Sequence, residues 1–324
     1  MEKQVKTIGV MTSGGDAPGM NAAIRAVVRT AIAKGLKVKG IQHGFAGLLN
    51  GEIFDMNIRS VSNIIHHGGT ILQTARCLEF KEDWAQELGK QKCIEYGIDG
   101  LVVIGGDGSF QGAQKLSNKG IPCIGIPGTI DNDIVCTDYT IGYDTAMNTA
   151  MDMIDRLRDT AQSHERCSVV EVMGRHAGHI ALNVGVATGA TVILLPEEGF
   201  DVKRDLVDRI QYVLSQGKKY FIVVVSEGVA TSDEIAKLLL EECGIDARST
   251  VLGHVQRGGK PTLQDRVIAT KMGFHAVQLL SNNIGNRVVC LKDNHIVDYD
   301  INEGLAMSKT IDEQLLVVSK YVSF

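Results

Sequence analysis

Short apolar runs alternate with helical patterns along nearly the whole chain, and this alternation is the strongest constraint on its fold. Strand-like runs are predicted at 7–11, 37–41, 101–104, 123–126, 167–173, 191–195, 220–226, 250–253 and 287–291. Between them, apolar residues recur at helical spacing, as in the segment that begins near Pro18 and ends at Gly35. This alternation predicts an α/β fold with mostly parallel sheets and right-handed crossovers.

Composition disfavours several classes of protein. The 324 residues suffice for two domains, and the net charge of −5 disfavours a general nucleic-acid binder, so an anionic ligand would need local arginine clusters. Seven scattered cysteines without a C-x-x-C pair predict neither a disulfide framework nor a zinc site, and they fit a reducing compartment. The longest aliphatic-aromatic run, 220–225, is too short to span a bilayer. We therefore expect a cytoplasmic protein that binds neither membrane nor nucleic acid.

Polar or glycine-rich turns follow six of the strand-like runs. These turns lie at 13–16, 105–109, 127–133, 174–175, 227 and 254–259. In open parallel sheets, ligands bind at the carboxyl ends of strands, where glycines allow close approach and helix N-termini offer free N–H groups to phosphates. One such turn would be ordinary, but six predict a site for a ligand with several phosphate groups.

Carboxylates in these turns suggest phosphoryl-transfer chemistry. Asp107 lies between glycines and could hold Mg²⁺, while Asp131 could orient a hydroxyl group and accept its proton. The alternatives are local: Asp16 and Asp107 could each cap a helix, and the 131–133 segment could be an Asx-rich turn.

Basic residues near the same turns could bind phosphate oxygens. The arginines concerned are Arg76, Arg166, Arg175, Arg248 and Arg257. A guanidinium group binds such oxygens through two parallel hydrogen bonds, although a single exposed arginine is more often just solvated. His254 could also donate to a phosphate. The pairs His66–His67 and His176/His179 lack companion ligands, so we expect no structural metal there.

Six motifs together resemble the bacterial-type ATP-dependent 6-phosphofructokinase family. They are TSGGDAPGMNAA at 12–23, VVIGGDGS at 102–109, PGTIDND at 127–133, DYTIGYDTA at 138–146, VMGRHAG at 172–178 and VLGHVQRGG at 251–259. They follow the family's order and spacing from the first strand to about residue 260. The resemblance implies transfer of the γ-phosphoryl group of Mg-ATP to the 1-hydroxyl of fructose 6-phosphate.

The resemblance also implies a role for each matched residue. The catalytic set would be Gly15, Arg76, Thr129, Asp131 and Arg175, with Asp131 as the base for the sugar hydroxyl. ATP would be bound by Gly15, Arg76, Cys77, Gly106, Asp107, Gly108 and Ser109, with Asp107 toward Mg²⁺. Fructose 6-phosphate would be bound by Thr129, Asp131, Met173, Gly174, Arg175, Glu227, His254 and Arg257, and by Arg166 and Arg248 from a neighbouring subunit.

The implied architecture is a homotetramer of subunits with two Rossmann-like three-layer lobes and the active site in the cleft between them. An ATP-binding lobe would comprise 1–141 and 254–305, and a fructose-6-phosphate-binding lobe 142–253 and 306–324. The effector ADP or phosphoenolpyruvate would be bound by Arg25, Arg29, Arg158 and Lys218.

Several positions bear on donor choice and regulation. The diphosphate-using branch of the superfamily typically has Asp at position 108 and Lys at position 128, so Gly108 and Gly128 favour ATP. Other positions depart from allosteric members, namely Thr191 in place of Glu, Gln216 in place of a basic residue and Ile58 in place of an Arg that can occur there. Cys77 replaces a more usual aromatic residue beside the nucleotide. We expect weakened or altered regulation.

Three alternatives remain at this stage. A diphosphate-dependent phosphofructokinase would differ in the phosphoryl donor. A lipid or NAD kinase could share the GGDG motif, but it would give no reason for PGTIDND or GHVQRGG. A non-catalytic nucleotide-sensing or RNA-binding α/β protein would leave Asp107, Asp131 and the arginines without a purpose.

Overall fold

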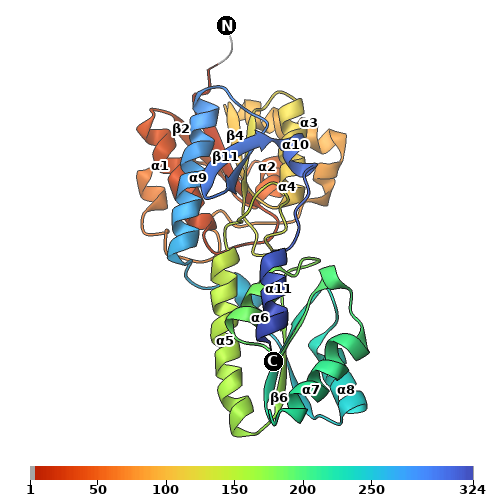
Figure 1. Ribbon diagram of the computed structural model, residues 1–324. Coiled ribbons are helices and arrows are strands. Elements are labelled where there is room, and N and C mark those ends of the chain that lie inside the picture. The colour runs from red at the N-terminus through yellow and green to blue at the C-terminus, as the bar shows by residue number, and fades with distance from the viewer. Residues whose placement is uncertain (1–3, 324) are drawn as a thin grey trace. The chain divides into compact units, whose positions relative to one another are not determined.

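The structure, a computed structural model, describes residues 4–323 and groups them into two compact units (Figure 1). The first unit runs to Ile130 and also contains Ile134–Thr145 and Arg257–Lys309. The second contains Asp131–Asp133, Ala146–Gln256 and the chain from Thr310 onward. The expected assignment of ATP to one lobe and the sugar phosphate to the other stays a prediction.

The first unit is built on a seven-stranded sheet in the order β11-β10-β5-β4-β1-β2-β3. The strands are β1 (Thr7–Ser13), β2 (Lys37–Ile41), β3 (Ile53–Met56), β4 (Gly100–Gly105), β5 (Cys123–Pro127), β10 (Arg287–Lys292) and β11 (His295–Asp300). The five inner strands are mutually parallel, while β3 and β11 pair antiparallel at the two edges. Every residue of β1, β4 and β5 is buried, as expected for parallel strands covered on both faces.

Helices cover both faces of this sheet and give it three layers. They are α1 (Met20–Ala33), α2 (Gly44–Asn50), α3 (Asp83–Glu95), α4 (Asp107–Asn118), α9 (Leu263–Ser281) and α10 (Ile301–Leu305), with 3₁₀ turns η1 (Ile58–Val61) and η2 (Leu78–Lys81). Helices α2, α3, α4 and α10 share one hydrophobic core with Met11, Leu101 and Val103 of the central strands. Because side chains alternate along a strand, Val10 and Val102 face the other layer, where α1 packs against α9.

The second unit has a four-stranded parallel sheet in the order β7-β8-β6-β9. Its strands are β6 (Cys167–Val172), β7 (Val192–Leu194), β8 (Phe221–Ser226) and β9 (Ala247–Val251). Its helices are α5 (Tyr143–Ser163, whose first three residues belong to the first unit), α6 (His179–Ala187), α7 (Asp208–Ser215), α8 (Ser232–Cys243) and α11 (Glu313–Val322). Shorter turns are η3 (Pro196–Glu198), η4 (Val202–Val207) and η5 (Gly253–Arg257, whose last residue belongs to the first unit). One core joins β6, β7 and β8 to η4, α7 and α8, while α11 packs on α6.

The predicted α/β class with mostly parallel sheets is confirmed, while one strand was misplaced and two strands were missed. Strand β9 ends at Val251, whereas the sequence pattern placed a strand at 250–253. Strands β3 and β11 were not predicted, because as edge strands they lack continuous apolar runs. Asp16 and Asp107 do not cap helices, since the N-cap of α1 is Gly19 and that of α4 is Gly106. Over residues 4–323, no helix combines the length and apolar character needed to cross a membrane.

Candidate active site

Three of the glycine-rich turns lie side by side at the carboxyl ends of β1, β4 and β5. The strand register pairs Ser13 with Gly105 and Gly105 with Pro127, so the three strands end together. The Ser109 hydroxyl donates to the Ser13 carbonyl at 3.0 Å, and the Gly128 amide donates to the Gly105 carbonyl at 2.9 Å. The turns at 13–16, 105–109 and 127–129 therefore form one continuous edge of the first unit.

The first turn of α4 leaves space for a ligand. Asp107 is its first residue, and a Cβ added at Gly106 or Gly108 would meet no atom within 4 Å. The Ser109 amide donates to the Gly106 carbonyl at 2.9 Å and closes this turn. The start of the helix presents the positive end of the helix dipole, which favours phosphate groups. This open turn is the part of the edge best suited to phosphate groups.

Arg257 reaches the turn after β1. A Cβ added at Gly15 would lie 3.2 Å from Arg257 Nη1, so the guanidinium group lies directly against this glycine. Arg257 Nε is buried, and no atom among the described residues accepts its hydrogen bond. The structure thus brings Arg257, expected at the sugar phosphate, to the turn expected at the ATP phosphates.

A network of side chains holds the loop that carries Arg76 and Cys77 beside the end of β1. The Thr74 hydroxyl donates to the Gly14 carbonyl at 2.8 Å, and the Thr12 hydroxyl donates to the Gln73 carbonyl at 2.7 Å. Asn21, which is 1% exposed, donates to the carbonyls of residues 67 and 68 and accepts from the amide of residue 71. Arg76 itself is exposed. Thr12 and Asn21 were not among the predicted site residues, although both lie within the first glycine motif.

In the second unit, Gly174 and Arg175 form a tight turn after β6. Arg175 has φ 54°, a left-handed conformation that a residue with a side chain rarely adopts. Glu227, which follows β8, accepts hydrogen bonds through Oε1 from the amides of Arg175 at 2.7 Å and Gly174 at 3.1 Å. The Glu227 carboxylate therefore stabilises the strained turn that presents Arg175.

Two residues that were not predicted complete this end of the sheet. Arg175 Nη1 lies 3.3 Å from Asp133 Oδ2, and the Gln256 side chain accepts from the Met173 amide at 2.9 Å. Gln256 has no solvent exposure. Asp131 is 4% exposed and belongs to the short segment that groups with this unit, while His254 in η5 is exposed. Asp133 lies in the motif PGTIDND and Gln256 in the motif VLGHVQRGG, so membership of these motifs could have identified both residues.

Arg166 and Arg248 lie at the opposite end of the same sheet. Arg166 immediately precedes β6, and Arg248 pairs in register with Ser168 near the start of that strand. At about 3.3 Å per residue, roughly 20 Å of strand separates them from Met173. The structure therefore does not bring these two arginines together with Arg175 and Glu227 in this unit.

The expected effector residues divide between the two units. Arg25 and Arg29 lie one turn apart on α1. In the second unit, Lys218 Nζ donates to the Thr191 hydroxyl at 2.8 Å, and Arg158 Nη2 donates to the Thr188 carbonyl. Burial and, to a lesser extent, the charge of Arg158 lower the pKa of Lys218.

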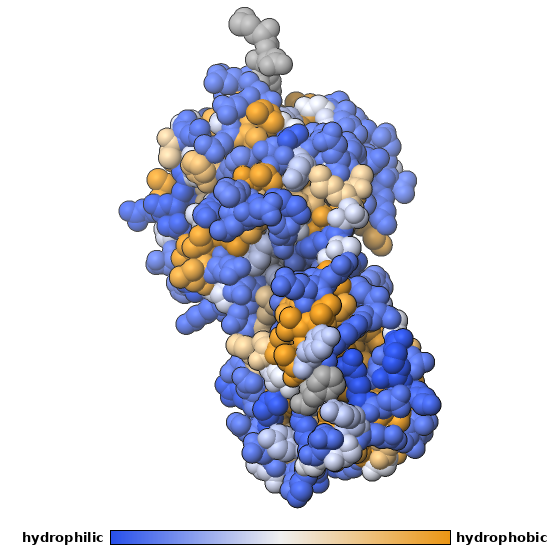
Figure 2. Space-filling model, viewed as in Figure 1, coloured by the Kyte–Doolittle hydropathy of each residue, from blue (hydrophilic) through white to orange (hydrophobic). Residues whose placement is uncertain are grey.

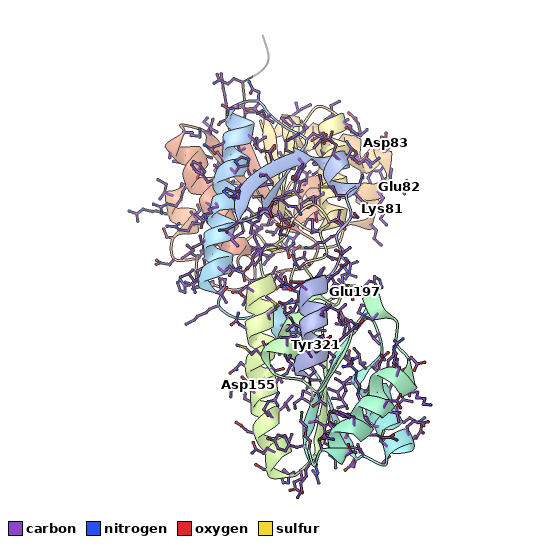
Figure 3. All side chains as sticks on the ribbon, viewed as in Figure 1. Lys81, Glu82, Asp83, Asp155, Glu197 and Tyr321 are labelled. Carbon is purple, nitrogen blue, oxygen red and sulfur yellow. The ribbon has the colours of Figure 1, made fainter. Side chains whose placement is uncertain are left out.

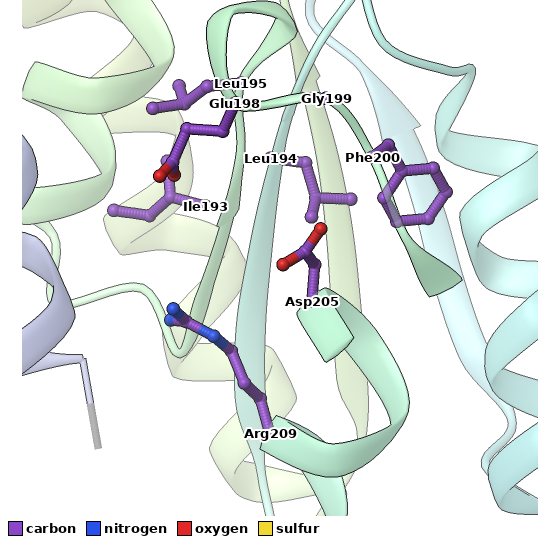
Figure 4. A pocket seen from close by; sticks show the side chains of 8 residues that line it. All are labelled: Ile193, Leu194, Leu195, Glu198, Gly199, Phe200, Asp205 and Arg209. Carbon is purple, nitrogen blue, oxygen red and sulfur yellow. The ribbon is translucent and has the colours of Figure 1, made fainter. Parts of the chain in front are cut away.

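A separate small pocket lies in the second unit (Figure 4). It is lined by Ile193, Leu194, Leu195, Glu198, Gly199, Phe200, Asp205 and Arg209. Figure 4 shows the Asp205 carboxylate and the Arg209 guanidinium group on its wall. None of the predicted site residues lines it.

The fold and the turns at its strand ends are those of an α/β protein suited to a phosphate-bearing ligand. Comparison with known proteins makes this class specific. The family described as Phosphofructokinase matches residues 7–280, and the chain belongs to this family.

Relatives are similar over nearly the full chain. An ATP-dependent 6-phosphofructokinase of Bacillus thuringiensis (strain Al Hakam) is 56% identical over 98% of this chain and 100% of the relative. A phosphofructokinase structure from Pichia pastoris in the T-state superposes with a TM-score of 0.89 at 37% identity, covering 99% of this chain and 36% of that one. A structure from Saccharomyces cerevisiae gives a TM-score of 0.87 at 35% identity, covering 98% and 46%. The chain thus spans less than half of the yeast chains and the whole of the bacterial relative.

Proposed function

We propose that this chain is an ATP-dependent 6-phosphofructokinase, which transfers the γ-phosphoryl group of Mg-ATP to the 1-hydroxyl of fructose 6-phosphate and releases ADP, fructose 1,6-bisphosphate and a proton. The observation that carries the proposal is the continuous edge of glycine turns at the ends of β1, β4 and β5, with the first turn of α4 open beside Asp107. The 56% identical relative is an ATP-dependent 6-phosphofructokinase, and the match covers 100% of its length. This relative supports the choice of reaction.

In this proposal the first unit binds ATP and the second binds the sugar phosphate. The N–H groups at the start of α4 and the turn at Gly15 would bind the ATP phosphates, with Arg76 alongside. Asp131 would accept the proton of the sugar hydroxyl, with Thr129 beside it, and Arg175 would stabilise charge on the transferring phosphoryl group.

Magnesium fits the residues present. Asp107 supplies one carboxylate in an open turn, and the described part of the chain has no cluster of three or more His, Cys, Asp or Glu residues for an all-protein metal site. Mg²⁺ characteristically binds through one or two carboxylates together with water and substrate phosphates. When bound, the ion would neutralise the phosphate charge that develops during transfer.

Arg166 and Arg248 enter the proposal as residues that serve a neighbouring subunit. Their position, roughly 20 Å of strand away from Met173, supports a role outside the sugar-phosphate site of their own subunit. Exposed apolar side chains on α11 provide further surface for contact between copies (Figure 2). Val317 is 54% exposed, Val322 is 55% exposed and Tyr321, labelled in Figure 3, is 77% exposed. The proposed location is the cytoplasm.

Regulation by ADP or phosphoenolpyruvate would act through Arg25, Arg29, Arg158 and Lys218. Lys218 donates to the neutral hydroxyl of Thr191 at 2.8 Å, and allosteric members of the family are expected to carry a carboxylate at this position. We therefore expect activation by Mg-ADP to be weak, and Thr191→Glu to strengthen it. Strong activation of the unmodified protein by Mg-ADP at subsaturating fructose 6-phosphate would refute this part of the proposal.

The experiment that tests the main proposal is steady-state phosphorylation of fructose 6-phosphate by the purified protein. Parallel assays contain Mg-ATP or Mg-diphosphate as the phosphoryl donor. Turnover with ATP alone supports the proposal. Turnover with diphosphate alone would instead assign the chain to the diphosphate-dependent branch, and turnover with neither donor would refute both assignments.

A further inference from the structure

Asp265 is a fully buried carboxylate to which the sequence motifs assign no role. It is the third residue of α9 and has no solvent exposure. Its two oxygens accept four hydrogen bonds, from the Tyr139 hydroxyl at 2.6 Å, the Gly142 amide at 2.7 Å, the Thr145 amide at 2.9 Å and the Thr145 hydroxyl at 2.5 Å. Burying a carboxylate is costly unless donors surround it, so four convergent donors indicate a selected arrangement.

The carboxylate is directed away from its own helix. Thr262 and Asp265 have the spacing of a capping box, in which the acidic side chain would accept from the Thr262 amide. Only one of the two hydrogen bonds of that motif forms, in which the Thr262 hydroxyl accepts from the Asp265 amide at 3.3 Å. The Thr262 amide donates instead to the Thr145 hydroxyl at 3.0 Å. The Asp265 side chain is therefore free to hold the segment 139–145.

That segment is paired with the residues that lead to Thr129. The Ile141 amide donates to the Pro127 carbonyl at 2.9 Å, and a parallel bridge joins Ile141 to Gly128. The Thr140 hydroxyl donates to the Thr129 carbonyl at 2.6 Å. A shift of the segment would therefore move the backbone of the turn after β5.

The same segment packs against the turn after β1. A Cβ added at Gly142, which has φ 104°, would lie 2.7 Å from Ala17 Cβ and 3.3 Å from Ile130 Cγ2. A Cβ added at Gly19 would lie 2.6 Å from Ile141 Cγ2. No larger residue fits between these backbones, so the segment is in close contact with both glycine turns.

We propose that Asp265 is a positioning residue for phosphoryl transfer: its carboxylate fixes the segment 139–145, and through that segment it sets the turns that carry Gly15 and Thr129. This inference rests on the function proposed above. Because Asp265 has no solvent exposure, we assign it no direct contact with a substrate. A displacement of about 1 Å at a reacting group can lower a rate by about a hundredfold, so loss of this anchor has a kinetic effect beyond its effect on stability.

The test compares Asp265→Asn with Asp298→Asn. Asp298 is a matched control because it also accepts side-chain hydrogen bonds in the first unit, from His275 at 2.8 Å and Arg287 at 2.6 Å. Arg287 begins β10, so this control lies at the amino end of that parallel strand, away from the glycine turns. Each variant is assayed at the same interval below its own thermal midpoint.

We expect kcat of Asp265→Asn to fall about 10- to 100-fold, while Asp298→Asn stays within about twofold of the unmodified protein. Hydrogen exchange should report faster exchange at the Ile141 and Gly142 amides in Asp265→Asn alone. Unchanged kcat, or equal loss of kcat in both variants, would overturn the proposal, as would unchanged exchange at these amides.

A second pair of variants covers the case in which Asp265→Asn does not fold. Thr145→Val removes one donor to Asp265 and the acceptor of the Thr262 amide, whereas Thr145→Ser keeps both. We expect a several-fold loss of kcat with Val and near-normal kcat with Ser, and equal kcat in the two would overturn the proposal. If the unmodified protein does not phosphorylate fructose 6-phosphate, the proposed function fails, while the exchange measurement still reports whether Asp265 holds the segment.

Discussion

Replacing Gly108 by Asp tests why this chain would use ATP. Gly108 is the second residue of α4, is exposed, and has open space where a side chain would begin. An acidic residue in the first turn of a helix is also compatible with the helix dipole. The substitution should therefore leave the fold intact, with a thermal midpoint equal to or slightly above that of the unmodified protein.

The size of the effect follows from the added charge. A carboxylate at position 108 would lie next to Asp107, at the turn proposed to bind the nucleotide phosphates. Two unit charges about 6 Å apart repel by about 3 kcal/mol at an effective dielectric constant of about 20. That energy corresponds to a loss of about a hundredfold in affinity. We therefore expect the KM for ATP to rise about a hundredfold.

Gly108→Asn is the matched control, because Asn has nearly the same volume as Asp and carries no charge. The assay is steady-state phosphorylation of fructose 6-phosphate with varied Mg-ATP at two ionic strengths. The Asp variant should lose much more ATP affinity than the Asn variant, and salt should reduce the difference. An equal rise in KM for the two variants would show that bulk, and not charge, limits this position.

Three further substitutions test other parts of the site and fold. Glu227→Ala removes the acceptor of the Gly174 and Arg175 amides, so kcat/KM for fructose 6-phosphate should fall about a hundredfold. Glu227→Gln keeps a neutral acceptor, so its kcat/KM should fall only about tenfold. Equal losses of kcat/KM in the two variants would contradict this reasoning. Asp131→Asn should lower kcat at least about a hundredfold with little change in either KM, and near-normal turnover would refute its role as base. Burial acts to raise the pKa of Asp298, but hydrogen bonds from His275 and Arg287 outweigh this effect and hold the pKa below its usual value. The ionised Asp298 therefore adds to the free energy of unfolding near neutral pH, and this contribution is lost as the pH falls below about 4. Chemical denaturation should accordingly show a smaller acid-induced loss of stability for Asp298→Asn, and identical pH dependence would contradict the assignment.

The parts of the fold that the sequence predicted are those buried on both sides. Strands such as β1 and β4 read as continuous apolar runs because helices cover both faces of the sheet. Strands β3 and β9 have exposed residues and no such run, so one was missed and the other was misplaced by a few residues. A strand buried on both faces can be recognised from its continuous apolar run, and an edge strand with exposed residues lacks such a run.

The candidate site divides in a similar way. Residues that directly follow a strand, such as Asp107 and Glu227, can be proposed from sequence because the strand end itself indicates the ligand-binding edge. Asp265 could not be, since its partners lie about 120 residues earlier and only the folded chain brings them together. Likewise, the Gln256 side chain accepts a hydrogen bond from the amide of Met173, which lies 83 residues earlier, and no local sequence pattern predicts this bond.

The order of segments in the first unit also affects how the chain folds while it is being synthesised. Helix α1 ends at Ala33, but α9, the helix that packs against it, begins only at Leu263, and β10 must later join the sheet beside β5. At roughly 5–20 residues per second, the ribosome needs on the order of 10 to 45 seconds to make the intervening chain. Until α9 and β10 have been made, the apolar face of α1 and the edge of β5 lack their native partners, which is the kind of exposed surface that promotes aggregation of a nascent chain.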